Sequence, residues 1–212
     1  MKFHYNQIAG KKPQRMEALS DGVFAIALTL LILELRVPVD ESIRTEKDLI
    51  ASFCLLMPKL LSYFMSFLTL GIFWMGHSMQ YQFIEKSDRN LSWISLFFLL
   101  FVSLLPFSTA FLSEHIAFKF AIFIYWLNIL LLGIVIYIHW DYAIHHDFIS
   151  LKDEQRNNVD KAIRKRVVVA QALYAVGALL CFVNTYISIS IIVLVQLNYA
   201  FGIIKGFWRE KR

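Results

Sequence analysis

The chain has 212 residues, of which 58% are apolar and only 17% are charged, whereas an average soluble protein has about 25% charged residues. A soluble domain of this size could not bury so much apolar surface, because a small domain leaves a large fraction of its residues at the surface. The same composition excludes an intrinsically disordered chain, since disordered chains are poor in apolar residues. We therefore predict an integral membrane protein.

Six segments along the chain are predicted to cross the membrane as helices. A helix needs roughly 20 mostly apolar residues to span a hydrocarbon core about 30 Å thick. The first segment is the least apolar, because its uncharged stretch runs only from Gly22 to Leu33 and acidic residues flank it. Pro38 is predicted to end this first helix. The predicted spans cover approximately residues 15–35, 58–84, 90–113, 118–140, 166–184 and 186–207.

The last two spans come from one uncharged run, Val167 to Ile204, which is too long for a single span. Asn184 and Thr185 lie near its middle, and asparagine favours turns. We therefore predict two helices joined by a tight turn. No Gly- or Pro-rich linker and no internal repeat divides the chain, so residues 1–212 are predicted to form one all-α, six-helix membrane domain.

Basic residues are distributed unevenly between the two sides of the predicted bundle. Most of the 21 Lys and Arg residues fall in the N-terminal tail, in the loops after spans two and four, and in the C-terminal tail. Short cytoplasmic loops are enriched in Lys and Arg, so both termini are predicted to be cytoplasmic. This bias accounts for the net charge of +5 without a nucleic-acid partner. The basic cluster Lys161 to Arg166 is assigned mainly to this signal, and contact with anionic lipid head groups is a second interpretation.

The densest group of polar residues at membrane depth opens the first span, at Arg15, Ser20 and Asp21. Placing an ionised Asp at the centre of a membrane helix costs about 2.5–3.5 kcal/mol, so Asp21 should face protein or water and have a partner. A second interpretation is an interfacial charge, with Ser20 or Asp21 capping the helix. In the second span, Trp74 and His77 share one helical face. His77 either partners Asp21 or Arg15, or is an ordinary buried histidine.

The first span also carries a pattern along one side of its helix. The residues on this line are Gly22, Ile26, Thr29, Leu30 and Leu33. If copies of the helix surrounded an axis, these residues would form stacked apolar rings and one ring of hydroxyls. A narrow apolar ring forces a cation to shed water, which costs potassium less than sodium. An ordinary packing seam would show the same periodicity, so both interpretations stay open.

Other residues that bear chemistry do not form a recognisable site. His139, His145, His146 and Asp147 lie near the end of the fourth span, but their spacing matches no metal-binding motif. The sequence contains no P-loop, dinucleotide fingerprint or nucleophile elbow. We therefore expect no enzyme activity, no cofactor, and no metal ion other than a permeant one.

The stretch from Arg15 to Ile26 resembles the signature of the transmembrane protein 175 family, the lysosomal potassium channels and their prokaryotic homologues. That signature is an Arg, three further residues and then Phe-Ser-Asp, and Leu19 replaces the Phe here. The six predicted spans match the prokaryotic branch of the family. The resemblance continues through the first half of the chain, at Thr29-Leu30-Leu31, Trp74, His77, Asp88-Arg89-Asn90 and Leu104-Leu105-Pro106-Phe107.

The resemblance implies a cation channel in which four chains surround a pore lined by the first helix, without a carbonyl selectivity filter. It implies a hydrophobic constriction at Ile26, followed by Leu30 and Leu33, with a ring of Thr29 hydroxyls beside it. Permeant K⁺ would pass transiently near Ile26 and Thr29. It also implies a polar network that holds the lining helices near the cytoplasmic side, made of Arg15, Ser20, Asp21, Trp74 and His77.

From the residues and the resemblance together we predict a homotetrameric, potassium-permeable channel in a prokaryotic cytoplasmic (inner) membrane. Its partners would be the lipid bilayer and permeant monovalent cations. The alternative is a proton-coupled secondary transporter that uses Asp21 and His77 as a relay. A third interpretation is a membrane scaffold that transports nothing.

Overall fold

The computed structural model describes residues 12–37 and 43–202, and these residues fold almost entirely into helices. Pro38, most of the N-terminal tail and the C-terminal tail lie outside the described residues. The prediction of an all-α protein is confirmed. The helices in chain order are α2 (Pro13–Leu30), the 3₁₀ turn η1 (Leu31–Glu34), α3 (Glu46–Cys54), α4 (Met57–Tyr81), α5 (Arg89–Glu114), α6 (Lys119–His145), α7 (Asp153–Leu179), the 3₁₀ turn η2 (Leu180–Phe182) and α8 (Thr185–Phe201).

Six of these helices correspond, in order, to the six predicted spans. Five are long and apolar enough to cross a membrane, namely α2 with its η1 extension, α4, α5, α6 and α7 with η2. The sixth, α8, is an apolar helix with 17 described residues. The predicted turn between the last two spans lies between the end of η2 and the start of α8. Asn184 caps α8 there, because its side chain accepts hydrogen bonds from the backbone N–H groups of Tyr186 and Ile187.

Three local features differ from the predicted boundaries. The α-helix of the first span ends at Leu30, and its last turn tightens into η1. α7 begins at Asp153, so the fifth span continues as helix through the charged segment that precedes residue 166. α3 was not predicted at all, because it is too short to span a membrane; a capping box between Thr45 and Asp48 starts it.

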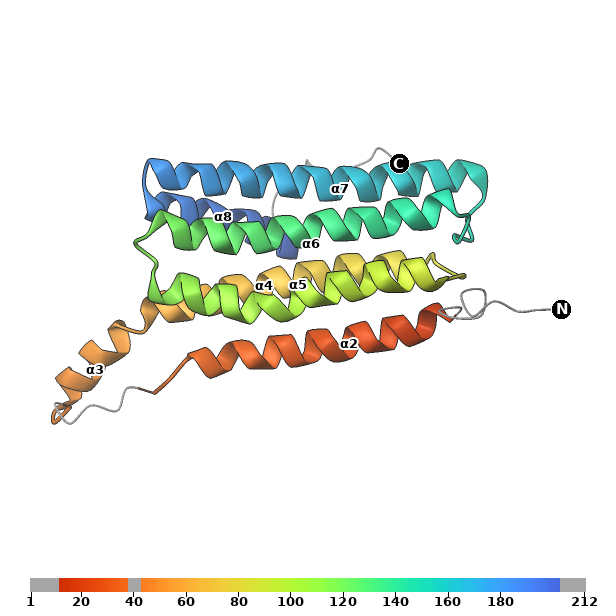
Figure 1. The fold of residues 1–212 in the computed structure, drawn as a ribbon. Coiled ribbons are helices and arrows are strands. Elements are labelled where there is room, and N and C mark those ends of the chain that lie inside the picture. The colour runs from red at the N-terminus through yellow and green to blue at the C-terminus, as the bar shows by residue number, and fades with distance from the viewer. Residues whose placement is uncertain (1–11, 38–42, 203–212) are drawn as a thin grey trace.

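The long helices lie side by side along one direction, with α2 on one side of the bundle and α7 on the other (Figure 1). α2 packs against α4 and α5, and α5 makes its most extensive contact with α6. α8 returns between α7 and α4, which closes the bundle. The core between the helices is apolar and aromatic, with Phe24, Leu70, Phe98 and Leu105 among its fully buried members. α2 therefore joins the bundle through one face only.

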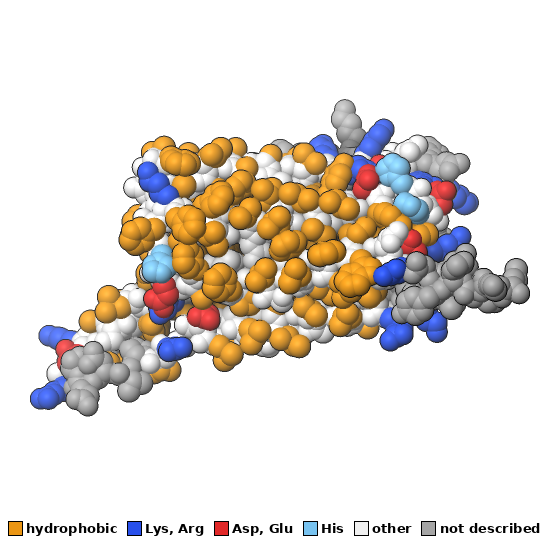
Figure 2. Space-filling view, viewed as in Figure 1, with side chains coloured by type: hydrophobic (Ala, Val, Ile, Leu, Met, Phe, Trp, Pro, Cys, Tyr) orange, Lys and Arg blue, Asp and Glu red, His pale blue; other side chains and the backbone are white. Residues whose placement is uncertain are grey.

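The surface of the bundle divides into a central apolar zone and two charged ends. Figure 2 shows hydrophobic side chains across the middle of this face, while Lys, Arg, Asp, Glu and His side chains gather at both ends. A helical bundle in a bilayer must present such an apolar band to the lipid tails and keep its charges at the two interfaces. The chain is therefore a multi-pass membrane protein whose long axis crosses the bilayer.

Candidate pore-lining helix and its polar contacts

The side of α2 that carries the predicted line of residues is uncovered in the single chain. Ile26 is 61% exposed and Leu33 is 66% exposed, and Leu30 and Thr29 are also exposed. The opposite side of the helix is buried, since Phe24 and Leu31 pack in the core. The structure therefore leaves this line free to face lipid or other copies of the chain.

Thr29 is the one hydroxyl on this uncovered line. Its Oγ1 donates to the backbone oxygens of Ala25, at 3.1 Å, and Ile26, at 2.8 Å. Because the hydroxyl proton is directed into the helix, the lone pairs of the oxygen remain available outside it. Copies of this side chain around an axis would present oxygen atoms to a passing cation.

Asp21 is held by a side chain of the second span. The Trp74 indole donates from Nε1 to Oδ1 of Asp21 over 2.9 Å, which ties α2 to α4. Ser20 is buried, but its hydroxyl donates within its own helix, to the Met16 backbone oxygen. Among the described residues, the exposed guanidinium of Arg15 has no ion pair with Asp21. The interpretation of Ser20 or Asp21 as a helix cap is wrong, because α2 begins earlier, at Pro13.

His77 is buried one helical turn from Trp74. Its ring stacks on Phe98 with centroids 4.6 Å apart, and Phe24 of α2 lies at 6.5 Å. Within the part of the chain that the structure describes, its Nε2 has no hydrogen-bond partner and no bond joins it to Asp21. The structure thus brings Asp21 and Trp74 together, while His77 contacts α2 through an aromatic ring.

Sequence reasoning missed a buried polar cluster beside His77. His139 of α6 lies 5.3 Å from the His77 ring, and its Nδ1 is 2.8 Å from Oε1 of Gln80. Tyr81 shares a hydrogen bond with Ser95 of α5. The signal was present in the sequence, since Trp74, His77, Gln80 and Tyr81 recur at helical spacing along one side of α4.

Three histidines that the sequence groups near the end of the fourth span are His139, His145 and His146. The structure separates them, because His139 is fully buried whereas His145 and His146 are exposed. The Nδ1 atoms of His145 and His146, at the end of α6, lie within hydrogen-bond distance of the Asp141 and Tyr142 backbone oxygens of that helix. Among the described residues, no group of three or more His, Cys, Asp or Glu side chains is placed to hold a metal ion.

A second polar cluster that was not foreseen lies deeper in the bundle. The Tyr125 hydroxyl is within hydrogen-bond distance of Ser66 and Thr69, at 3.3 and 3.2 Å. Thr109 donates to Ser66, and Gln196 donates to Thr69. These bonds join α4, α5, α6 and α8 and satisfy polar groups that the lipid could not.

Comparison with known proteins decides which family this arrangement belongs to. Residues 15–106 match the family model described as "Endosomal/lysosomal potassium channel TMEM175". A protein of Chamaesiphon minutus named a potassium channel is 31% identical over 189 residues, covering 88% of this chain and 92% of the relative. This chain belongs to the TMEM175 family. The resemblance inferred from the signature is therefore confirmed, and the family is one of channels and not of enzymes.

Other members of the TMEM175 family extend the comparison. A Chryseobacterium protein named a potassium channel is 29% identical over 186 residues, covering 86% of this chain and 90% of that protein. Human TMEM175, named an endosomal/lysosomal proton channel, is 37% identical over 98 residues, covering 44% of this chain and 19% of the human protein. The crystal structure of a lysosomal potassium-selective channel TMEM175 homolog from Chamaesiphon minutus superposes with a TM-score of 0.76 at 27% identity, covering 90% of this chain and 97% of that one.

Proposed function

We propose that four copies of this chain form a potassium-permeable channel in a prokaryotic cytoplasmic membrane, with α2 of each copy lining the pore. The observation that carries the proposal is the uncovered line on α2, where Ile26, Leu30 and Leu33 are exposed although they belong to a helix whose other side is buried. The bacterial relatives named potassium channels and the fold shared with a potassium-selective homologue support it.

Selectivity in this proposal comes from dehydration. Ile26 and Leu30 are separated by about one helical turn, so four copies would form successive apolar rings about 6 Å apart. A cation that crosses a narrow apolar ring sheds much of its water, and this costs potassium less than the smaller sodium ion. Thr29 hydroxyl oxygens beside the constriction would replace part of the lost water. The chain would need no carbonyl filter.

The polar residues at the start of α2 have a different role in the proposal. In the proposal, Arg15, Ser20 and Asp21 of α2 together with Trp74 and His77 of α4 fix the lining helix. The support is the Asp21–Trp74 hydrogen bond between the two helices and the contact of the His77 ring with Phe24. In the proposal this end of α2 and both termini lie on the cytoplasmic side, and the positive-inside bias of the sequence supports that orientation.

The test is the Ile26→Asn variant, reconstituted in liposomes and compared with wild type in potassium and sodium flux. Asparagine offers an amide to a dehydrated ion and draws water into the ring, so the potassium-to-sodium permeability ratio should fall toward one. The matched control is Val176→Asn, because Val176 is similarly exposed, at 56%, but lies on α7 at the opposite side of the bundle. An unchanged ratio in Ile26→Asn, or an equal fall in the control, contradicts the assignment.

A second candidate for the transported species is the proton, as in a proton-coupled transporter that uses Asp21 and His77. Two observations favour it: His77 is buried with Nε2 unpartnered among the described residues, and the human relative is named a proton channel. Saturable flux that follows a pH gradient, and that disappears in both Asp21→Asn and His77→Asn, would support this candidate. Potassium flux that persists in both variants would support the channel.

A further inference from the structure

A groove of about 390 Å³ lies between α6 and α7, at the end of the bundle where η2 leads into α8. Its lining includes Phe120, Phe123 and Trp126 on the α6 side, and Ala175, Ala178 and Phe182 on the side of α7 and η2. α7 lies on the opposite side of the bundle from α2 (Figure 1). Copies of the chain that meet through α2 would therefore leave this groove open to the lipid.

Large side chains on one helix face small ones on the other along the groove. Phe120, Phe123 and Trp126 recur every three residues on α6, and successive ring centroids are 6.4 and 5.9 Å apart. Three residues of helix rise by about 4.5 Å, so these rings form a wall about 9 Å long. Ala175 and Ala178 have the same spacing on α7 and are too short to fill the space opposite the rings. The result is an apolar groove that the chain itself leaves unfilled.

The groove runs from one membrane interface toward the apolar zone. Lys119 lines it and is the first residue of α6, whereas Trp126 lies seven residues further along that helix, about 10 Å deeper. On the facing wall, Phe182 belongs to η2 at the end of the fifth span, and Ala175 lies seven residues back toward the middle of that span. Both walls therefore place their interfacial residues at the same end, with apolar residues deeper.

The entrance of the groove carries a positive charge that no acidic side chain balances among the described residues. Lys119 forms no ion pair there, and Glu114, the acid nearest to it in sequence, is paired with Lys59. Lys119 Nζ donates to the Phe182 backbone oxygen over 3.5 Å and lies 5.5 Å from the centre of the Phe182 ring, and both partners are uncharged. α6 also begins here without a side-chain cap and without an acid in its first turn, so its positive end adds to the attraction for an anion.

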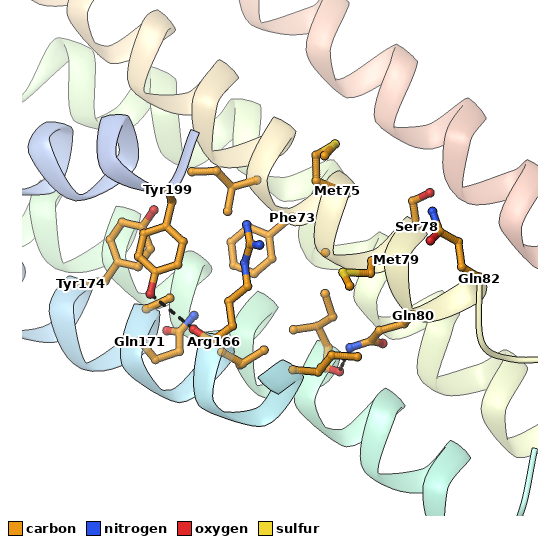
Figure 3. Close-up of a pocket in the computed structure, with 16 residues that line it drawn as sticks. Phe73, Met75, Ser78, Met79, Gln80, Gln82, Arg166, Gln171, Tyr174 and Tyr199 are labelled. Atoms are coloured by element: carbon orange, nitrogen blue, oxygen red, sulfur yellow. Dashed lines mark hydrogen bonds between the residues drawn. The ribbon is translucent and has the colours of Figure 1, made fainter. Parts of the chain in front are cut away.

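A second cavity, between α4 and α7, differs from the groove in this respect. Figure 3 shows Arg166 in that cavity beside Tyr199, whose hydroxyl donates to the Arg166 backbone oxygen. The Arg166 guanidinium lies 5.7 Å from the Tyr199 ring centre and is engaged within the chain. Because its arginine is already engaged, that cavity does not support an anion site.

We propose that the groove between α6 and α7 binds an anionic phospholipid, with its phosphate at Lys119 and one acyl chain along Phe123 and Trp126. The phosphate replaces the Phe182 carbonyl as the partner of the ammonium, because a charged acceptor binds a cation more strongly than a neutral one. The acyl chain occupies the space over Ala175 and removes the exposed rings from their other surroundings. The lipid bridges two helices of the subunit from outside the ion pathway.

The test is lipid binding to the purified full-length protein in neutral detergent, measured by native mass spectrometry. Phosphatidylglycerol should bind about fivefold more tightly than phosphatidylcholine, because it alone of the two carries a net negative charge. Lys119→Gln should remove this preference. Lys47→Gln is the matched control and should keep it, because Lys47 is an exposed lysine of α3, at the same end of the bundle, that does not line the groove.

Two further variants keep the proposal testable if Lys119→Gln does not fold. Phe118→Asp places a carboxylate at the N-cap of α6, where it balances the lysine and caps the helix, so the preference should disappear without loss of the helix. Ala175→Phe should fill the deep part of the groove and reduce the binding of both lipids. Leu173→Phe places the same side chain on α7 outside the groove lining and should leave binding unchanged.

The proposal is overturned if Lys119→Gln and Lys47→Gln lose the preference equally, which would indicate a diffuse effect of charge at this end, or if Ala175→Phe binds both lipids as wild type does. It is also overturned if oleate displaces phosphatidylglycerol at equal concentration, because the occupant would then be a free fatty acid. Binding of neither lipid by wild type, with a second copy of the chain covering the groove, overturns it as well.

Discussion

At the scale of single residues, the charge at the start of the first span has a partner of its own. Sequence reasoning predicted that Asp21 needs a partner and placed Trp74 and His77 on one face of the second span. The structure selects the indole, and the bond from Trp74 joins two helices. Which of the two side chains reaches Asp21 depends on how α4 is rotated against α2, and helical periodicity within one segment does not contain that information.

Trp74→Phe tests this bond directly. The substitution keeps an aromatic ring and removes the N–H, so a hydrogen bond to a carboxylate is lost and the protein should be destabilised by about 1 kcal/mol. The measurement is the unfolding temperature of the purified protein in detergent. Trp93→Phe is the control, because Trp93 is an exposed tryptophan of α5. Equal unfolding temperatures for the two variants would show that the Asp21–Trp74 bond contributes nothing.

The uncovered line on α2 was predictable from the sequence, whereas the buried polar cluster around His139 was predictable only in part. A period of 3.6 residues places Ile26, Leu30 and Leu33 together, and in the structure these side chains are exposed together. For the buried cluster, the spacing of His77, Gln80 and Tyr81 on α4 was visible in the sequence. Their contact with His139 escaped prediction, because His139 comes from the distant α6 and no local motif joins the two segments. Local patterns identify faces, and the packing of helices decides what each face meets.

At the scale of elements, turns with a specific chemistry were predicted better than helix lengths. Asn184 was identified as a turn former, and it caps α8. The charged segment before residue 166 gave no sign of where helix begins, because charged residues are as compatible with an extended cytoplasmic helix as with a loop. In the structure, ion pairs support that extension: Arg156 pairs with Asp147, and Arg164 pairs with Asp141 of α6.

The contact between α6 and α7 depends on a glycine. A Cβ atom added to Gly133 would lie 1.9 Å from the side-chain nitrogen of Gln171, which donates to the Ile129 backbone oxygen. Gly133 therefore gives Gln171 the room to lie flat across α6. The Gln171 side chain in turn provides a hydrogen bond between two spans.

Gly133→Ala should displace the Gln171 side chain and break its bond to Ile129, lowering the stability by about 1 kcal/mol. The cost should shrink when Gln171→Ala is already present, because the displaced group is then absent. Unfolding temperatures of the two single variants and the double variant measure this coupling. Gly71→Ala is the control, since an added Cβ meets nothing within 4 Å there. Additive effects of Gly133→Ala and Gln171→Ala would contradict the argument.

At the scale of the whole molecule, the two ends of the bundle differ in how many ion pairs the described residues form there. Lys59 of α4 and Glu114 of α5 form an ion pair at one end, while Arg156 and Arg164 form several at the other. Some of the basic residues that carry the predicted positive-inside bias therefore also hold helices together. Sequence counting detected the bias but could not distinguish paired arginines from solvated lysines.

The α2 face that carries Ile26, Leu30 and Leu33 is uncovered in the single chain, and the symmetry of an oligomer would cover it with other copies of the same helix. α2 lies at one side of the bundle, so four copies with α2 turned inward would close a ring around an axis. Such a ring would bring four copies of residue 26 to the same level of the pore. If residue 26 were a cysteine, four thiol groups would meet at this level, and several thiolates together bind a soft metal ion tightly.

Ile26→Cys, in a chain whose Cys54 and Cys181 are replaced by Ser and Ala, tests the axis. Four thiols converging on one point should bind Cd²⁺ tightly, so Cd²⁺ added to reconstituted protein should block potassium flux and a chelator should restore it. Val176→Cys in the same background is the control, because that residue is as exposed but lies on α7. Block of both variants would mean that Cd²⁺ acts elsewhere. An Ile26→Cys tetramer that conducts unhindered in Cd²⁺ would place residue 26 away from the axis and remove the physical basis of the proposed constriction.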